Sequence, residues 1–393
     1  MRRAVTTHSL PSAERYRASE LGDAPWILVP KDERRILDKM RAVGSPLGDV
    51  TSAIFTGLQT SADPIYIVED RGMRRGLQII ATRAGTEIEV EPNLLHPLAS
   101  GLDVERYALR TLDSLLLFPY RRQEGKMVLL TQDELRALPK TWAYLLEHEP
   151  ALRGREKGKM DHDGWWAYVY PKNLGLHDQP KLGVAATVKR LEVAADPAAA
   201  AYFHNVRVNG ILPRDDGPSL STLTAVLNSR AVDFAFRRGA APLQNGFYTA
   251  NKQFIAWLPV PAELPDGLAV AGARLHELVA LAETERSGFL DWLASIIEAR
   301  PRDLAGAEAL ASYSQTGLDG VLAVLDKNAS RLAIDPRRRA DRERISQELT
   351  ESAGKIADLE SARVLLERDV DAAVYDAYGL SAAQQACIAS EYE

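Results

Sequence analysis

The chain has 393 residues, of which 46% are hydrophobic and 26% are charged. This globular composition excludes collagen-like, disordered and disulfide-scaffold proteins, and at about 100–200 residues per domain it predicts two or three domains. The single cysteine, Cys387, excludes an internal disulfide and a CxxC-type zinc site. No apolar run approaches the ~20 residues of a membrane span, and the N-terminus lacks the apolar core of a secretory signal. We therefore expect a soluble, cytoplasmic protein.

The net charge of −6 hides an uneven distribution. Residues 1–262 carry 34 Lys/Arg and 30 Asp/Glu, whereas residues 263–393 carry 14 and 24. Within the first part, residues 151–262 hold 14 basic and 9 acidic side chains. This asymmetry suggests that one module meets a polyanion while the other faces solvent or protein.

The first two thirds of the chain contain short apolar runs rich in Val, Ile, Tyr and Trp, separated by Gly and Pro, which predict strands. The predicted strands are PIYIVED (64–70), two within 76–90, SLLLFPY (114–120), KMVLL (126–130) and WWAYVYP (165–171).

Two helices are predicted among these strands. One spans residues 131–155, where Thr131 and Glu134 form a capping box and Pro139 divides the helix. The other spans residues 218–239.

Helical periodicity dominates the rest of the chain. One helix is predicted to end before Pro301, and another to begin after residues 335–339. The second has a heptad-like apolar seam of about 35 residues, but Ser352 and Arg363 occupy two seam positions. We therefore expect an antiparallel helical pair packed on another part of the protein. The predicted fold class is α+β, with a mixed β-rich domain followed by this long-helix module.

The common catalytic motifs are absent, since the chain has no Walker A, GxGxxG, HExxH or GxSxG sequence. Residues 161–163 (Asp-His-Asp) are interpreted as a solvated turn rather than a metal site. Asp113, Glu124 and Lys126 resemble a Mg²⁺-dependent nuclease triad. A hairpin turn at Glu124–Gly125 is the favoured interpretation, so no catalytic or metal residue is predicted.

A basic segment carries the strongest sign of nucleic-acid binding. Four cations occur within residues 152–159, just before the aromatic residues of 165–170. Lys and Arg neutralise phosphates, and arginine also bonds guanine. A solvated loop followed by a core strand explains the same pattern, and both interpretations remain open. The predicted DNA-contacting residues are Arg153, Arg155, Lys157, Lys159, Lys172, Arg237, Arg238 and Lys252.

Several segments together carry a family resemblance. They are GDVTSAIFTGLQTSADPIYIVED (48–70), LLHPLASGLDVERY (94–107), LLFPY (116–120), PKTWAYLLEHEPALRGR (139–155), LNSRAVDFAFR (227–237), the F-x-x-W-L-P-V-P ending at residue 261, and ERDVDAAVYDAYGL (367–380). In this order they resemble the TaqI-like C-terminal specificity domain of adenine-specific DNA methyltransferases and type IIG restriction-modification enzymes. The resemblance implies a target-recognition domain forming one wall of a DNA cleft.

The motif residues of this family are Gly57, Gln59 and Thr60, which either position the next strand or contact DNA. The catalytic [DNS]-P-P-[YFW] motif and the Gly-rich S-adenosylmethionine loop are absent. We therefore expect no cofactor in this chain and S-adenosylmethionine on a catalytic partner.

The resemblance divides the chain into three parts. Residues 1–45 resemble the end of a methyltransferase domain, residues 46–262 form the target-recognition domain, and residues 263–393 form a helical spacer and docking module. The predicted function is a specificity subunit, or C-terminal half, that binds double-stranded DNA with a methyltransferase partner in trans. The alternatives are the nuclease above and a helical scaffold that does not bind DNA.

Overall fold

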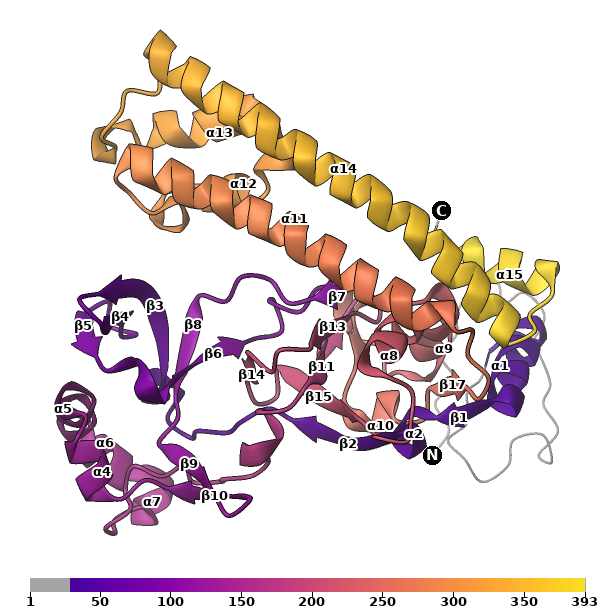
Figure 1. Ribbon diagram of the computed structural model, residues 1–393, viewed down its shortest axis with the longest axis horizontal. Coiled ribbons are helices and arrows are strands. Elements are labelled where there is room, and N and C mark those ends of the chain that lie inside the picture. The colour runs from indigo at the N-terminus through magenta and orange to yellow at the C-terminus, as the bar shows by residue number, and fades with distance from the viewer. Residues whose placement is uncertain (1–28, 393) are drawn as a thin grey trace, which may run out of the picture.

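The structure is a computed structural model that describes residues 29–392. Two main sheets lie side by side, and two long helices rise from one of them (Figure 1). Strands precede the long helices instead of alternating with them, which confirms the predicted α+β fold. Within the described residues, no helix is both long and apolar enough to cross a bilayer. Residues 1–28 of the predicted lead segment lie outside this range.

The first sheet has five strands, antiparallel except for the pair β13–β7. In sheet order they are β2 (Thr51–Thr56), β15 (Val208–Pro213), β11 (Lys181–Ala185), β13 (Val193–Asp196) and β7 (Tyr107–Ala108). Two helices, α8 (Leu220–Leu227) and α9 (Arg230–Gly239), follow β15, and α8 packs on the sheet. Every residue of β11 and β13 is buried, as expected for strands covered on both faces.

The second sheet has six strands and lies at the left of Figure 1. In sheet order they are β14 (Tyr202–Phe203), β6 (Leu95–Ala99), β8 (Ser114–Leu117), β3 (Ile67–Arg74), β4 (Leu77–Ala81) and β5 (Glu87–Val90). The strands predicted within 76–90 and 114–120 are therefore confirmed. In the predicted strand 64–70, the first turn is instead the short helix α3 (Asp63–Tyr66).

A hairpin and four short helices complete this half. The hairpin joins β9 (Tyr120–Gln123) and β10 (Lys126–Leu129) through Glu124 and Gly125, whose φ values are 49° and 79°. Positive φ at both positions is typical of a two-residue hairpin turn. The helices are α4 (Gln132–Arg136), α5 (Pro139–Glu147), α6 (Glu149–Arg153) and α7 (Arg155–Gly158). Thr131 and Glu134 form the predicted capping box, and Pro139 starts a new helix as predicted.

The predicted strand at residues 165–171 is wrong. Residues 164–167 form turns, and Trp165, Trp166 and Tyr168 are all buried. Trp166 Nε1 donates to the carbonyl of Leu130, and the Tyr168 hydroxyl donates to that of Leu117. A strand would send alternate side chains to opposite faces, whereas here all three rings enter one core.

The predicted helix 218–239 is two helices. Ser229 caps α9 by accepting a hydrogen bond from the backbone N–H of Val232. The Asn228 side chain bonds both backbone groups of Val193 in β13. The break between the helices lets the Asn228 side chain satisfy the buried backbone groups of Val193, the first residue of β13.

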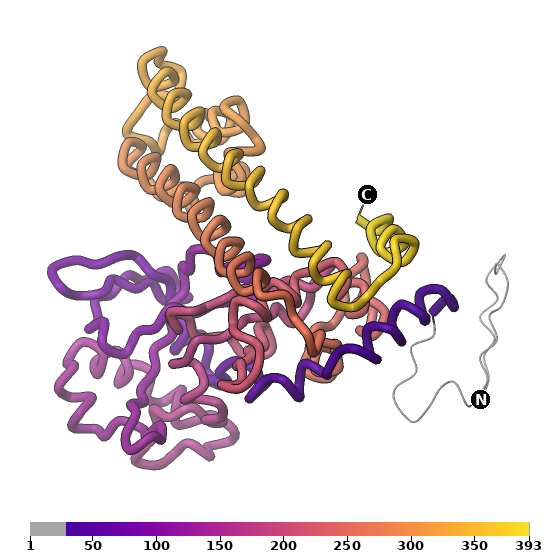
Figure 2. Tube along the Cα trace, turned by 45° about the vertical axis from the view of Figure 1, so that its right-hand side comes forward, coloured from indigo at the N-terminus to yellow at the C-terminus, as the bar shows by residue number. Residues whose placement is uncertain are grey.

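The two long helices are α11 (Gly267–Ile297) and α14 (Arg339–Ala377). They run antiparallel along each other, as both views show (Figure 2), and this confirms the predicted helical pair. Their outer ends are joined through η5 (Pro301–Asp303), α12 (Ala307–Ala311), α13 (Tyr313–Lys327) and η6 (Ala329–Arg331). Ser352 is buried in the seam and its hydroxyl bonds that of Tyr313, 2.6 Å away. The polar side chain of Ser352 is thus buried in the seam and finds its hydrogen-bond partner in α13.

The remaining elements are short connections between these parts and the elements near the two ends of the chain. They are α1 (Lys31–Val43), β1 (Gly44–Pro46), α2 (Leu47–Val50), η2 (Pro92–Leu94), η3 (Leu174–Leu176), β12 (Thr187–Val188), η4 (Gln244–Gly246), β16 (Tyr248–Thr249), α10 (Lys252–Ile255), β17 (Pro259–Pro261) and α15 (Ala382–Ala389). The largest apolar core unites α1, the first sheet, α8, α9, the inner ends of α11 and α14, and α15. A second core fills the six-stranded half, and a third joins the outer ends of the long helices.

Candidate nucleic-acid interface

The Gly57–Thr60 motif connects the two sheets through backbone hydrogen bonds. The Leu58 N–H donates to the carbonyl of Phe203, and the Leu58 carbonyl accepts from the N–H of Asn205. A Cβ at Gly57 would lie 2.3 Å from the carbonyl oxygen of Phe203, so only glycine allows this approach. The motif therefore has a clear architectural role, and the Gln59 side chain remains exposed beside it.

The basic segment is an irregular loop at the end of α6. Glu156, Lys157 and Gly158 follow one another with φ values of 49°, 60° and 87°. Positive φ is uncommon for residues other than glycine, and two such residues followed by Gly158 make α7 a distorted turn instead of a regular helix. Lys157 and Lys159 are exposed on this turn.

Arg155 does not belong to the exposed set, although the sequence placed it among the DNA contacts. Its side chain is buried, with 9% of the residue's surface exposed. The guanidinium donates to four carbonyl oxygens, those of Leu152, Thr60, Trp165 and Ala167. Because these hydrogen bonds hold the loop to the motif, the Arg155 guanidinium is not available to a phosphate.

Arg153 is similarly occupied. Its guanidinium bonds Glu149 at 2.7 Å and Asp161 at 3.1 Å, and it lies over the ring of Trp165. Two carboxylates already neutralise this charge, so Arg153 makes a poor phosphate ligand.

Tyr170 links Lys159 to the motif. Its Nζ is 5.2 Å from the ring centre of Tyr170, and Tyr170 pairs with Gln59 in an isolated β-bridge. Lys172 is exposed two residues later. Lys157, Lys159, Lys172 and Gln59 thus come from neighbouring loops. Lys252 is also exposed, at the start of α10.

Arg237 and Arg238 lie elsewhere and are already paired. Arg237 contacts Asp233 at 3.1 Å and Glu391 at 2.5 Å. Arg238 contacts Glu33 at 2.8 Å and also pairs with Glu391. These partly buried ion pairs join α9 to α1 and to the segment after α15 (right side of Figure 1). The predicted DNA-binding role of the two arginines is therefore not supported, because their charge holds the chain ends.

Among the described residues, no ion pair joins Asp113 to Lys126 of the nuclease-like triad. Asp113 precedes β8 and pairs with Arg302 at 2.9 Å, whereas Glu124 and Lys126 lie beyond it in the β9–β10 hairpin. Among residues 29–392, no group of three or more His, Cys, Asp or Glu residues is arranged to hold a metal ion.

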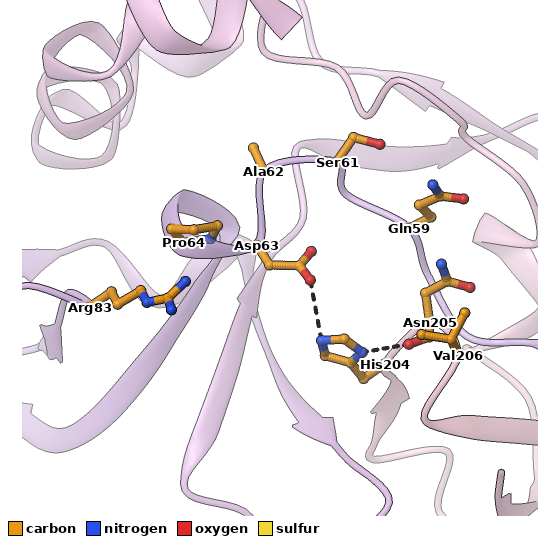
Figure 3. A pocket seen from close by; sticks show the side chains of 9 residues that line it. All are labelled: Gln59, Ser61, Ala62, Asp63, Pro64, Arg83, His204, Asn205 and Val206. Carbon is orange, nitrogen blue, oxygen red and sulfur yellow. Dashed lines mark hydrogen bonds and ion pairs between the residues drawn. The ribbon is translucent and has the colours of Figure 1, made fainter. Parts of the chain in front are cut away.

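A pocket of about 400 Å³ opens where the motif meets the loop after β14 (Figure 3). It is lined by Gln59, Ser61, Ala62, Asp63, Pro64, Arg83, His204, Asn205 and Val206. His204 Nε2 lies 3.4 Å from an oxygen of Asp63, and Nδ1 lies 2.7 Å from the carbonyl oxygen of Asn205. The interaction with Asp63 raises the pKa of His204 and lowers the pKa of Asp63.

The sequence did not predict this pocket, because its lining comes from three separated segments. Gln59–Pro64, Arg83 and His204–Val206 are brought together only by the pairing of the two sheets. The polar His-Asn pair directly after an apolar run at 199–203 was the one local signal available.

The chain is similar in sequence to a known enzyme. The type II methyltransferase M.XhoI from Xanthomonas vasicola is 24% identical over 280 residues, which cover 67% of this chain and 47% of that protein. Over this part of its length the chain is similar to a type II methyltransferase. It spans about half the length of that relative, and no protein-family model matches it.

A solved structure is also similar, though at a lower level. The type IIG restriction endonuclease BpuSI matches with 12% identity and a TM-score of 0.37, over 85% of this chain and 33% of that one. The TaqI-like assignment remains a prediction from the motifs.

Proposed function

We propose that this chain is the sequence-specific DNA-recognition part of an adenine-specific DNA methyltransferase or restriction-modification enzyme. It binds double-stranded DNA and acts with a catalytic partner in trans, in the cytoplasm. The partner supplies S-adenosylmethionine and the methyl-transfer chemistry. The relationship to M.XhoI supports this assignment, as does the order of the TaqI-like motifs.

The observation that carries the proposal is the group of exposed lysines beside the family motif. Lys157, Lys159 and Lys172 are exposed and have no ion-pair partner within residues 29–392. Lys159 lies over the ring of Tyr170, which pairs with Gln59. Unpaired lysines on loops neutralise phosphates and fix a protein on the duplex. Lys252 extends the proposed phosphate-binding set.

The other two parts of the chain have different proposed roles. Residues 46–262 recognise DNA, and residues 263–393 act as spacer and docking surface for the partner. The helical module carries a net charge of −10, which suits a protein surface better than a phosphate backbone.

The test is selection from random DNA. The purified chain is incubated at low salt with a pool of random duplexes, and the retained DNA is sequenced. We expect enrichment of a short motif that contains adenine. Retention without a motif would contradict sequence recognition, and no retention would favour the scaffold alternative. Adding a candidate methyltransferase then tests whether a catalytic partner tightens binding to the same motif.

A further inference from the structure

The loop that follows β14 presents an apolar side chain to solvent from an unfavourable backbone conformation. Val206 has a φ of 52° and 70% of its surface is exposed. A β-branched residue is rarely found in this left-handed region. The loop is held by hydrogen bonds from the N–H of Asn205 to Leu58 and from the N–H of Val208 to His204. Strain of this kind is concentrated at functional sites, where the surrounding structure enforces it.

Two carboxamides lie next to this valine. Asn205 immediately precedes Val206, and Gln59 follows Leu58, whose carbonyl accepts the hydrogen bond from Asn205. Figure 3 shows Gln59, Asn205 and Val206 on the same side of the pocket. Neither carboxamide has a hydrogen-bond partner in the part of the chain that the structure describes. Each keeps a donor and an acceptor for a ligand.

The charged groups around the pocket are mainly cationic. Arg83 lines it and Arg207 follows Val206; both are exposed and, within residues 29–392, have no ion pair or side-chain hydrogen bond. His204 adds a group whose positive form is favoured by Asp63. The pocket therefore combines amide donors and acceptors with a rim that attracts a polyanion.

A hydrolytic role for the pocket does not fit its geometry. Ser61, Asp63 and His204 are the residue types of a nucleophile, an acid and a base. However, Nε2 of His204 faces Asp63 and Nδ1 contacts the carbonyl of Asn205, so both ring nitrogens are engaged. The imidazole has no nitrogen left to take a proton from Ser61.

We propose that Gln59 and Asn205 read one A·T base pair in the major groove, with Val206 packed against the thymine methyl group. This inference rests on the proposed DNA-recognition function and names the residues that specify sequence. Asn and Gln bond adenine through its N6 donor and N7 acceptor, and small apolar side chains contact the thymine methyl. A carboxamide and a valine adjacent in one rigid loop match these two features of a single base pair.

The test replaces single functional groups in the DNA. The motif enriched by the wild-type chain is synthesised with 7-deazaadenine at each adenine in turn, which removes the N7 acceptor. We expect wild-type affinity to fall about 5- to 150-fold at one position. The Gln59→Ala/Asn205→Ala variant should bind more weakly and should not distinguish adenine from 7-deazaadenine at that position.

A second substitution tests the valine independently. Uracil in place of the paired thymine removes the methyl group and should weaken wild-type binding about fourfold. Val206→Ala should reduce this difference. Ser61→Ala, in the same pocket, is the control and should respond to both base analogues as the wild type does.

The outcomes separate this inference from the proposed function. If the double variant enriches the same motif and keeps full sensitivity to 7-deazaadenine, Gln59 and Asn205 do not read the base pair, although sequence recognition stands. If the wild type retains no DNA, or retains DNA without a motif, the proposed function fails and the inference fails with it. Thermal unfolding of each variant shows whether a lost preference reflects a lost fold.

Discussion

The guanidinium of Arg155 donates a hydrogen bond to the carbonyl oxygen of Thr60, 3.2 Å away. This bond joins the lysine-bearing loop to the family motif, which are 95 residues apart in the sequence. The same guanidinium also bonds the carbonyls of Trp165 and Ala167. One buried cation thus positions Gln59 on one side and Lys157 and Lys159 on the other.

Substitution of Arg155 should therefore cost stability. Arg155→Ala leaves four backbone carbonyls without their donor, and we expect the free energy of unfolding to fall by about 3 kcal/mol. Arg155→Lys keeps the charge but not the planar fork, so it should rescue only part of this loss. Denaturant unfolding measures both. Arg153→Ala, which removes two partly exposed ion pairs and the contact with the Trp165 ring, should lower the free energy of unfolding by less than Arg155→Ala does.

Substitution of Lys157 and Lys159 should weaken DNA binding without a loss of stability. The Lys157→Ala/Lys159→Ala variant should unfold like the wild type, because both side chains are exposed. If each lysine neutralises one phosphate, the slope of log affinity against log salt concentration becomes less steep by about 1.8. Fluorescence anisotropy at several salt concentrations measures this slope.

A matched control removes two cations from the helical module. Arg339→Ala/Lys355→Ala makes the same change in net charge on α14, and the salt slope should stay as in the wild type. Equal effects of both double variants would mean that overall charge, and not this loop, governs binding.

The His204–Asp63 pair predicts a pH dependence of stability. His204 has a raised pKa in the folded protein, so its contribution is fully present below the unfolded value of about 6.5 and is lost as pH rises through the folded pKa. Asp63, whose pKa is lowered, contributes above about pH 3.8 and loses its contribution as pH falls through its folded pKa. The stability difference between wild type and His204→Gln should decrease as pH rises from about 6 to about 8.

Only the difference between the two proteins isolates this pair. Burial lowers the pKa of His177 to about 3, so its burial in the neutral form costs stability as pH falls below about 6.5. This opposite trend is common to wild type and variant, and it cancels in the comparison. A difference that stays constant across this pH range would contradict the assigned ion pair.

Arg238 should be important for stability and not for DNA binding. Arg238→Ala leaves Glu33 without its partner and removes one of the two arginines that pair with Glu391, so we expect the free energy of unfolding to fall by about 1–3 kcal/mol. The salt slope of DNA binding should not change. A less steep slope at unaltered stability would instead place Arg238 in the interface.

The elements predicted well from sequence are those with strong local signals. The apolar periodicity around Ser352 predicts the long helix α14, and Thr131 with Glu134 predicts the start of α4. The turn at Glu124–Gly125 predicts the β9–β10 hairpin. In each case the deciding interactions lie within one turn of helix or one pair of adjacent strands.

The predictions that failed depend on distant contacts. Residues 165–171 have the composition of a strand. However, the side chains of Trp166 and Tyr168 donate hydrogen bonds to backbone carbonyls in a core built from residues much earlier in the chain. The predicted helix 218–239 divides at Asn228 because the Asn228 side chain hydrogen-bonds the backbone of Val193 in β13.

The sequence alone determined an α+β protein with an antiparallel helical pair and a basic segment at residues 152–159. These properties follow from composition, periodicity and order along the chain. Only the tertiary structure decided which cations are available. Arg155 and Lys157 are two residues apart, yet one is buried against four carbonyls and the other faces solvent. Gln59 and Asn205 likewise lie close together only because the hydrogen bonds of Leu58 with Phe203 and Asn205 join their two segments. Burial and pairing depend on what the rest of the chain brings to each side chain, and local sequence does not contain that information.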